Sequence, residues 1–189
     1  MKLLIVLSSI LFVSLNASIS LPSSFSTDFQ QTITNDKGKV INYTGHIYFK
    51  NMVEAIADDS GIEHSYARSI FKWNYTSPSK KEVCTDGIQL VIVDHDLEQV
   101  ASYLVDESID LKSILSVAQK ISSTNYKATY KDVEYLITLD SNSRLSKIIY
   151  VDNLENNVKI LFSDMNYNKI LESRLLECNA PQEYDIIKG

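Results

Sequence analysis

Short stretches in which apolar and polar residues alternate, separated by turn-forming residues, constrain the fold of this chain most. Side chains of a strand point alternately to two faces, so such stretches predict strands with one buried face. Asp86-Gly87 and Ser77-Pro78 are typical of the turns between them. Short strands joined by short turns predict an antiparallel meander. We expect its strands at residues 25–33, 39–49, 69–75, 81–85, 88–94, 125–130, 133–139, 144–151, 157–164 and 170–178.

One segment, DLKSILSVAQKIS at residues 110–122, has helical periodicity. Its apolar residues recur at intervals of three and four, and Asp110 or Ser108 is placed to cap its start. These residues are Leu111, Ile114, Leu115 and Ala118. Residues 51–69 look like an insertion with a short helix at its front, ended by residues 58–61. A sheet that curls around so few helices exposes apolar concave surface, which is a candidate binding site, although a filled core is the alternative.

The amino terminus predicts export. LLIVLSSILFV at residues 3–13 is apolar but too short to span a bilayer, and it lies between Lys2 and a run of small polar residues. We expect residues 1–17 to be a signal peptide, with cleavage near Ser20 as the alternative, and residues 18–189 to form one soluble domain. No cysteine follows the apolar run, so we expect no lipid anchor.

The charge and cysteine content narrow the class of partner. A formal net charge of −6 without a Lys/Arg cluster argues against nucleic acid and against electrostatic docking on anionic lipid. The two cysteines, Cys84 and Cys178, could form a disulfide in an oxidising compartment, but their spacing does not decide whether they do.

The sequence contains no recognisable catalytic or metal-binding motif. We find no nucleophile elbow, HExxH, CxxC or phosphate-loop motif, and His46, His64 and His95 stand in unrelated segments. The acidic residues around His95 could hold a cation, but an acidic turn after a strand explains them more simply. We therefore predict neither an enzyme nor a metal or cofactor site.

The segment IFKWNY at residues 70–75 alternates strictly, so Phe71, Trp73 and Tyr75 share one face of a strand. This aromatic row is either core or the lining of a surface that meets an apolar ligand.

The segments YTGHIYFK (43–50), IFKWNYTSP (70–78), TDGIQLVIVD (85–94), DLEQV (96–100) and NAPQEYDII (179–187) occur in an order that resembles the periplasmic outer-membrane lipoprotein carrier (LolA) family. The composition, rich in Asn, Lys and Ile, suits an epsilonproteobacterial type. The resemblance implies a mainly β fold, an incomplete antiparallel barrel whose concave apolar face is covered by lid helices.

The same resemblance implies a monomeric chaperone in the Gram-negative periplasm. It would take triacylated lipoproteins from an inner-membrane ABC-type transporter and pass them on at the outer membrane, to a receptor if one is present. In this chain the acyl-binding residues would be Ile47, Phe49, Phe71, Trp73, Tyr75, Leu90, Ile92, Leu111, Ile114 and Leu115.

Two features depart from the family pattern. The arginine that latches the lid has no counterpart after Lys50, and Arg68 is the candidate replacement; an amino-terminal lid helix also has little room before residue 25. Two other functions are alternatives to the carrier. A lipid-sensing or lipoprotein-sensing module of related fold is the nearer alternative, and a secreted hydrolase is the more remote one.

Overall fold

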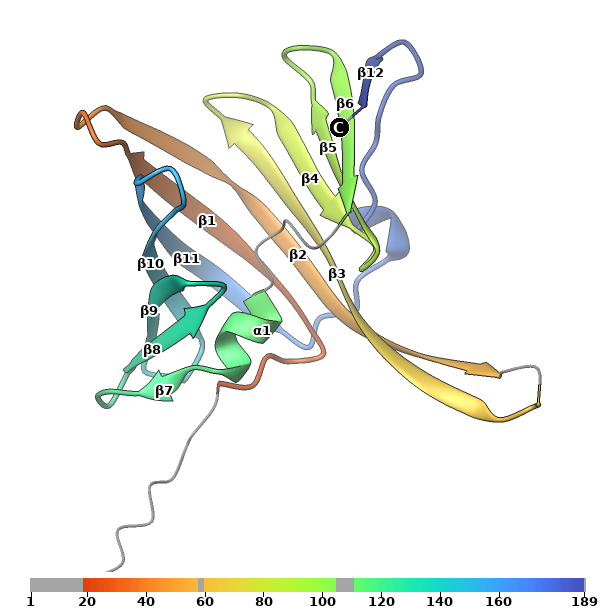
Figure 1. Cartoon of the computed structure of the whole chain (residues 1–189), viewed down its shortest axis with the longest axis horizontal. Helices are drawn as coiled ribbons and strands as arrows, with labels where there is room; N and C mark the ends of the chain where they lie inside the picture. Colours follow the sequence, from red (N-terminus) through yellow and green to blue (C-terminus); the bar gives the residue numbers. More distant parts are fainter. Residues whose placement is uncertain (1–18, 58–59, 105–110, 189) are drawn as a thin grey trace, which may run out of the picture.

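The computed structural model describes residues 19–57, 60–104 and 111–188. Strands dominate these residues, and Figure 1 shows them as one strongly curved sheet with a single α-helix on its concave side. The strands are β1 (Ser24–Thr34), β2 (Val40–Ala57), β3 (Glu63–Ser77), β4 (Lys81–Thr85), β5 (Gln89–Asp94), β6 (Gln99–Leu104), β7 (Gln119–Lys120), β8 (Asn125–Tyr130), β9 (Val133–Leu139), β10 (Leu145–Val151), β11 (Asn157–Tyr167) and β12 (Asp185–Lys188). The helices are α1 (Leu111–Ser116) and the short 3-10 helix η2 (Ser173–Leu175).

The sheet is an incomplete barrel, as the resemblance implied. Its 12 strands run in the order β12-β6-β5-β4-β3-β2-β1-β11-β10-β9-β8-β7, so β12 and β7 are the two edges. Neighbours are antiparallel except for β12, which pairs parallel with β6. β1 lies between β2 and β11 and joins the two halves of the sheet. Within the described residues, we find no helix with the length and apolarity needed to cross a membrane.

Strand register places the apolar side chains on the concave face. Because directly paired residues share a face, the pairing of Phe25 with Phe49 and of Phe49 with Phe71 forms an aromatic row across three strands. In a neighbouring row Gly45 lies beside Phe29. A Cβ at Gly45 would lie 2.7 Å from a ring carbon of Phe29 and 2.1 Å from the Asn74 carbonyl oxygen, so this position requires glycine.

Helix α1 closes the core over one half of the sheet. Ile114 and Leu115 are 1% and 0% exposed and pack with the apolar residues of β8 to β11. The helix ends at Ser116, earlier than its sequence periodicity predicted, because Gln119–Lys120 pair with β8 as strand β7. Ala118 is nevertheless buried. The predicted capping residues 108 and 110 lie outside the described residues.

The prediction of a short helix at the front of residues 51–69 was wrong. Strand β2 continues to Ala57, and its residues pair with β3 from Asn51 opposite Ser69 to Ala57 opposite Glu63. Met, Glu and Ala favour helix locally, but cross-strand pairing outweighs a propensity of less than about 1 kcal/mol per residue. Residues 51–57 and 63–69 are therefore a continuation of the β2–β3 hairpin.

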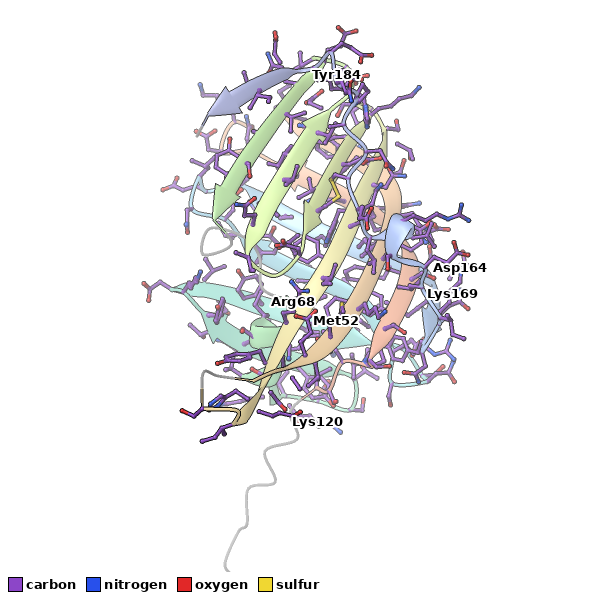
Figure 2. All side chains as sticks on the ribbon, turned by 90° about the vertical axis from the view of Figure 1, so that its right-hand side faces the viewer. Met52, Arg68, Lys120, Asp164, Lys169 and Tyr184 are labelled. Atoms are coloured by element: carbon purple, nitrogen blue, oxygen red, sulfur yellow. A yellow bond between two sulfur atoms is a disulfide. The ribbon has the colours of Figure 1, made fainter. Side chains whose placement is uncertain are left out.

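The carboxyl-terminal segment also differs from the prediction. Residues 170–178 form η2 and irregular chain rather than a strand, while β6, β7 and β12 were not expected. We call residues 176–184 the strap, because they run along the face of the sheet opposite α1. Cys178 of the strap is joined to Cys84 of β4 by a disulfide with an S–S distance of 2.01 Å (Figure 2).

Polar contacts fasten the strap further. Lys72 Nζ donates a hydrogen bond of 2.8 Å to the Glu177 carbonyl oxygen and forms a 3.0 Å ion pair with Glu82. The backbone N–H of Asn179 donates to Glu82 at 2.8 Å. The side chains of Lys72 and Glu82 are only 7% and 12% exposed, so the strap covers a buried ion pair. These contacts join the chain around Cys178 to side chains of β3 and β4, and they explain why residues 170–178 do not pair as a strand.

Candidate functional site

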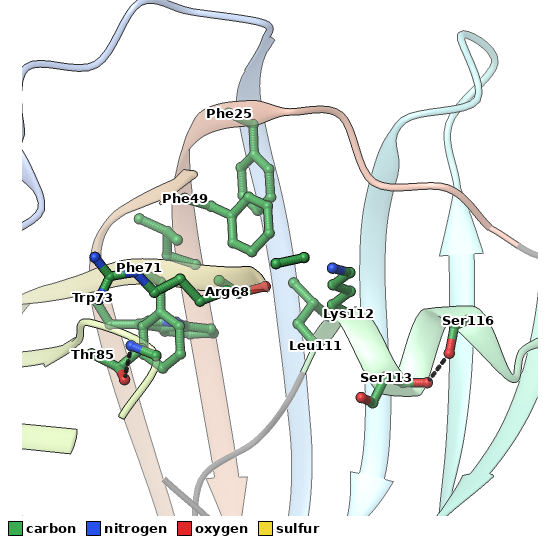
Figure 3. A pocket seen from close by; sticks show the side chains of 14 residues that line it. Phe25, Phe49, Arg68, Phe71, Trp73, Thr85, Leu111, Lys112, Ser113 and Ser116 are labelled. Atoms are coloured by element: carbon green, nitrogen blue, oxygen red, sulfur yellow. Dashed lines mark hydrogen bonds between the residues drawn. The ribbon is translucent and has the colours of Figure 1, made fainter. Parts of the chain in front are cut away.

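A cavity of about 400 Å³ opens between α1 and strands β1 to β4. Figure 3 shows aromatic rings from three strands on one side of it and α1 on the other. Leu111, Lys112, Ser113 and Ser116 contribute the helical wall. The residues contributed by the sheet and its turns are Phe25, Ile47, Phe49, Ala67, Arg68, Ser69, Phe71, Trp73, Thr85 and Gly87.

A second hollow of about 150 Å³ continues along the concave face toward β5. Phe71 and Trp73 line both spaces, so we call the two adjoining hollows the trough. Trp73 and Tyr75 pack edge-on against Phe29, each with ring centroids 5.0 Å apart, which fixes the aromatic floor. The residues that line the second hollow are Gln31, Phe71, Trp73, Tyr75, Val83, Leu90 and Ile160.

The structure brings most of the residues nominated from the sequence to the trough. Ile47, Phe49, Phe71, Trp73 and Leu111 line the larger cavity, and Tyr75 and Leu90 line the smaller one. The other three nominated residues, Ile92, Ile114 and Leu115, line neither hollow.

These three residues lie beside or beneath the trough. Ile92 lies on the trough face of β5 opposite Val83. Ile114 and Leu115 face the packed core under α1, so they support the trough without lining it.

Several lining residues were missed in the sequence. Phe25 and Gln31 lie on β1, Val83 on β4 and Ile160 on β11. Each belongs to a stretch that was predicted to be a strand, and alternation marks which of its residues share a face. The sequence does not say how far β1 and β11 lie from the aromatic row, because their pairing joins residues more than 100 positions apart.

The trough floor is neutral and mainly apolar. The Tyr75 hydroxyl donates a 3.3 Å hydrogen bond to Gln31 Oε1 inside the second hollow. Burial, reinforced by the neighbouring Tyr43, raises the pKa of Tyr75 well above its usual range, so the phenol stays protonated. Such a surface provides contact area for a long apolar ligand and little that would fix the ligand's identity.

Charged side chains stand at the mouth of the larger cavity. Arg68 forms a 2.5 Å ion pair with Glu54 across the β2–β3 hairpin, and donates a 3.2 Å hydrogen bond to the Asp86 carbonyl oxygen in the β4–β5 turn. Gly87 lies directly against the Arg68 side chain. Arg68 therefore joins the base of the β2–β3 hairpin to the β4–β5 turn, and we call this contact the Arg68 clasp. The role of Arg68 as a latch for a lid helix stays a prediction.

The residues considered for a cation are engaged in structural contacts. Asp94 forms a 3.1 Å ion pair with Lys81 and accepts backbone N–H groups from Asp96 and Leu97. Although burial opposes it, the hydrogen bond from Lys81 holds the pKa of Asp94 below its usual value. His95 contacts Tyr184 of the strap. This arrangement agrees with an acidic turn after a strand.

The other residues that could bind a metal ion also take part in structural contacts. Glu82, Cys84 and Cys178 bring their ligand atoms within 4.8 Å of one another, but the two sulfurs form the disulfide and Glu82 pairs with Lys72. His46 forms a 2.5 Å contact with Asp28 on the surface of the sheet. These contacts fasten strands and the strap.

The fold and the trough together define a class, the open half-barrels whose concave apolar face lies partly beneath a helix. Within this class, the family model described as "Outer membrane lipoprotein carrier protein LolA" matches residues 69–178. The chain belongs to the LolA family.

Three relatives carry the description "Outer-membrane lipoprotein carrier protein". The protein of Campylobacter jejuni is 30% identical over 88% of this chain and 87% of its own length. That of Wolinella succinogenes is 29% identical over 87% of both chains. That of Helicobacter hepaticus is 24% identical over 87% of this chain and 83% of its own.

Proposed function

We propose that this protein carries acylated lipoproteins from the inner to the outer membrane and shields their acyl chains in the trough. Membership of the LolA family and the names of its relatives support this proposal. Each methylene removed from water contributes about 0.8 kcal/mol, so one long acyl chain needs shielding worth on the order of 10 kcal/mol. Lipoproteins with several such chains cannot cross an aqueous compartment unaided.

The observation that carries the proposal is the pair Phe71 and Trp73, which lines both hollows of the trough. A broad aromatic and aliphatic surface holds acyl chains through contact area and accepts cargo of varied sequence. It provides no source of energy for loading. Energy for releasing lipoproteins from the inner membrane would come from an ABC-type transporter there, cargo would pass to an outer-membrane receptor if one is present, and the carrier itself would have no enzymatic activity and no cofactor.

The proposal includes the location and processing of the chain. Residues 1–17 act as a signal peptide, and residues 18–189 form the mature monomeric carrier in the periplasm. The oxidising character of that compartment suits the disulfide between Cys84 and Cys178.

A release assay tests the proposal. Mature protein is added to spheroplasts that retain labelled triacylated lipoprotein, and lipoprotein bound to the carrier is measured in the soluble fraction. Phe71→Glu places a carboxylate on the trough floor and is expected to abolish stable complex formation, because an unpaired charge in an apolar site is costly. Leu161→Glu is the matched control, since Leu161 lies on the outer face of β11 and is 37% exposed. Failure of the folded wild-type protein to release cargo would contradict the proposal.

A further inference from the structure

The β2–β3 hairpin extends well beyond the rest of the sheet. Pairing of β1 with β2 ends at Ser24 opposite Lys50, and pairing of β4 with β3 ends at Phe71 opposite Thr85. Among the residues that the structure describes, the strand pairs of residues 52–57 are with residues 63–68, and we call these two segments, together with residues 60–62, the arm. Figure 1 shows the arm projecting away from the body of the sheet.

The arm exposes large apolar side chains on both of its faces. Val53, Ile62 and Tyr66 are 71%, 59% and 56% exposed. Val53 lies opposite Ala67 and Tyr66 lies opposite Glu54, so the side chains of Val53 and Tyr66 point to opposite faces of the ribbon. A ribbon with water on both faces would ordinarily carry polar residues on both, so the apolar residues need another explanation.

The base of the arm is part of the trough. Ala67 and Arg68 line the larger cavity together with Phe71. The hydrogen bond from Arg68 to the Asp86 carbonyl oxygen ties the base of the arm to the β4–β5 turn beside this cavity, and the ion pair with Glu54 joins the two strands of the arm. Whatever surface the arm touches is therefore brought next to the opening of the trough.

We propose that the arm is a contact site for a lipid surface, at which acyl chains pass between the bilayer and the trough without crossing water. This inference rests on the carrier function proposed above. A lipid surface surrounds an inserted ribbon and satisfies apolar side chains on both faces, whereas a docked protein usually covers one. Tyrosine, with an apolar ring and a polar hydroxyl, suits the interfacial layer. The few apolar side chains give a weak and reversible contact, which a shuttling carrier needs.

The charge of the arm selects the type of lipid. Residues 51–69 include Glu54, Asp58, Asp59 and Glu63 but only one arginine, Arg68. Carboxylates must stay hydrated, so the backbone of the arm rests in the headgroup layer while its apolar side chains reach the outermost part of the acyl chains. It prefers zwitterionic to anionic lipid, and salt weakens that preference by screening the repulsion.

A tryptophan reporter tests the contact directly. The chain has one tryptophan, so Tyr66→Trp in a Trp73→Phe background places the reporter on the arm alone. With phosphatidylcholine vesicles that carry brominated acyl chains, its fluorescence is expected to shift to shorter wavelength and to be quenched. Phosphatidylglycerol at low salt should reduce the quenching. The matched control is Leu154→Trp in the same background, since Leu154 is 79% exposed in the distant β10–β11 turn. Equal quenching of the two reporters would overturn the proposal.

A transfer assay separates the arm from the trough. Val53→Ser with Tyr66→Ser is compared with Leu154→Ser for uptake of a fluorescent acylated peptide, presented either in protein-free vesicles or as monomers in solution. The arm variant is expected to take up the probe from vesicles about tenfold more slowly, because two apolar side chains no longer leave water, and to bind the dissolved probe normally. Unchanged uptake from vesicles would overturn the proposal and favour a protein partner for the arm. Loss of binding in solution as well would also overturn it, because the defect would then lie in the trough.

Discussion

The two halves of the sheet present the same kind of concave face but fill it differently. In the half formed by β8 to β11, Ile137, Ile148 and Val158 are at most 4% exposed beneath α1. In the half formed by β3 to β6, Phe71, Leu90 and Ile92 are only partly buried, and the trough lies over part of this surface. One half has the packing of an ordinary core, and the other keeps its apolar surface available.

The open half is stabilised from its other face. The strap covers that face with a disulfide to Cys84 and a buried ion pair between Lys72 and Glu82, and Val93 there is 0% exposed. The comparison shows that a sheet can leave a concave face unfilled when its convex face is fastened. A ligand-binding surface then does not have to serve as the core of its own strands.

The largest effect is expected from breaking the buried ion pair. Lys72→Met leaves the Glu82 carboxylate buried without its cation, which should cost about 3 to 5 kcal/mol of unfolding free energy. Denaturant unfolding measures the loss, and hydrogen exchange should show it as opening of β3 to β5 before β8 to β11. The double variant Lys72→Met with Glu82→Leu should recover most of the stability. If it does not, the strap depends on more than charge pairing.

An isoleucine pair tests the difference in packing directly. Ile137→Ala in the filled half should lower the unfolding free energy by about 2 to 5 kcal/mol, because it leaves a cavity in a close-packed core. Ile92→Ala in the open half should lower it by roughly 1 kcal/mol, since that side chain is already partly in water. Both variants are compared by urea unfolding. Equal losses would mean that the two halves are packed alike.

Removal of the disulfide should loosen the open half more than the filled half. The bond spans a sequence separation of 94 residues, and Cys84→Ala with Cys178→Ala should cost about 2 to 4 kcal/mol by freeing the unfolded chain. Native-state hydrogen exchange should then rise in β4, β5 and β12. Protection in β9 to β11 should fall by no more than the loss in global unfolding free energy, and so by less than in the open half. Uniform loosening across both halves would remove the distinction.

The smallest effect concerns the turn beside the Arg68 clasp. The hydrogen bond from the backbone N–H of Gln89, with a weaker contribution from that of Ile88, holds the pKa of Asp86 below its usual value although burial opposes this shift. This contribution to stability is present above the pKa of the unfolded state and is lost as pH falls through the lower folded value. Asp86→Asn should cost less than about 1 kcal/mol at neutral pH, because the group is exposed and screened. The stability difference from the wild-type protein should vanish in strong acid.

Alternation and turn residues predicted most strands because both patterns are local. β1, β4, β5 and β8 to β11 fall within a few residues of their expected bounds. The failures occur where distant contacts decide the structure. Residues 51–57 are a strand because they pair with β3. Residues 170–178 are not a strand because the disulfide to Cys84 and the hydrogen bond from Lys72 attach them to the face of the sheet.

The alternation of residues 70–75 correctly predicted that Phe71, Trp73 and Tyr75 share one face of a strand. All three line the second hollow. The extent of the trough was not predictable in the same way. It depends on the long-range pairing of β1 with β11 and on where α1 stops, and neither follows from spacing along the chain.

The open sheet has a consequence for behaviour at high concentration. An unclosed sheet offers unpaired edge groups to other copies, which promotes edge-to-edge aggregation. Here one edge, β7, is 2 residues long and the other, β12, is 4 residues long with Asp185 and Lys188 at its ends. Such short edges give a second chain little backbone to pair with. The two ends of the half-barrel therefore offer little template for fibre growth, and the outer edges of the arm are the longer unpaired edges of the sheet.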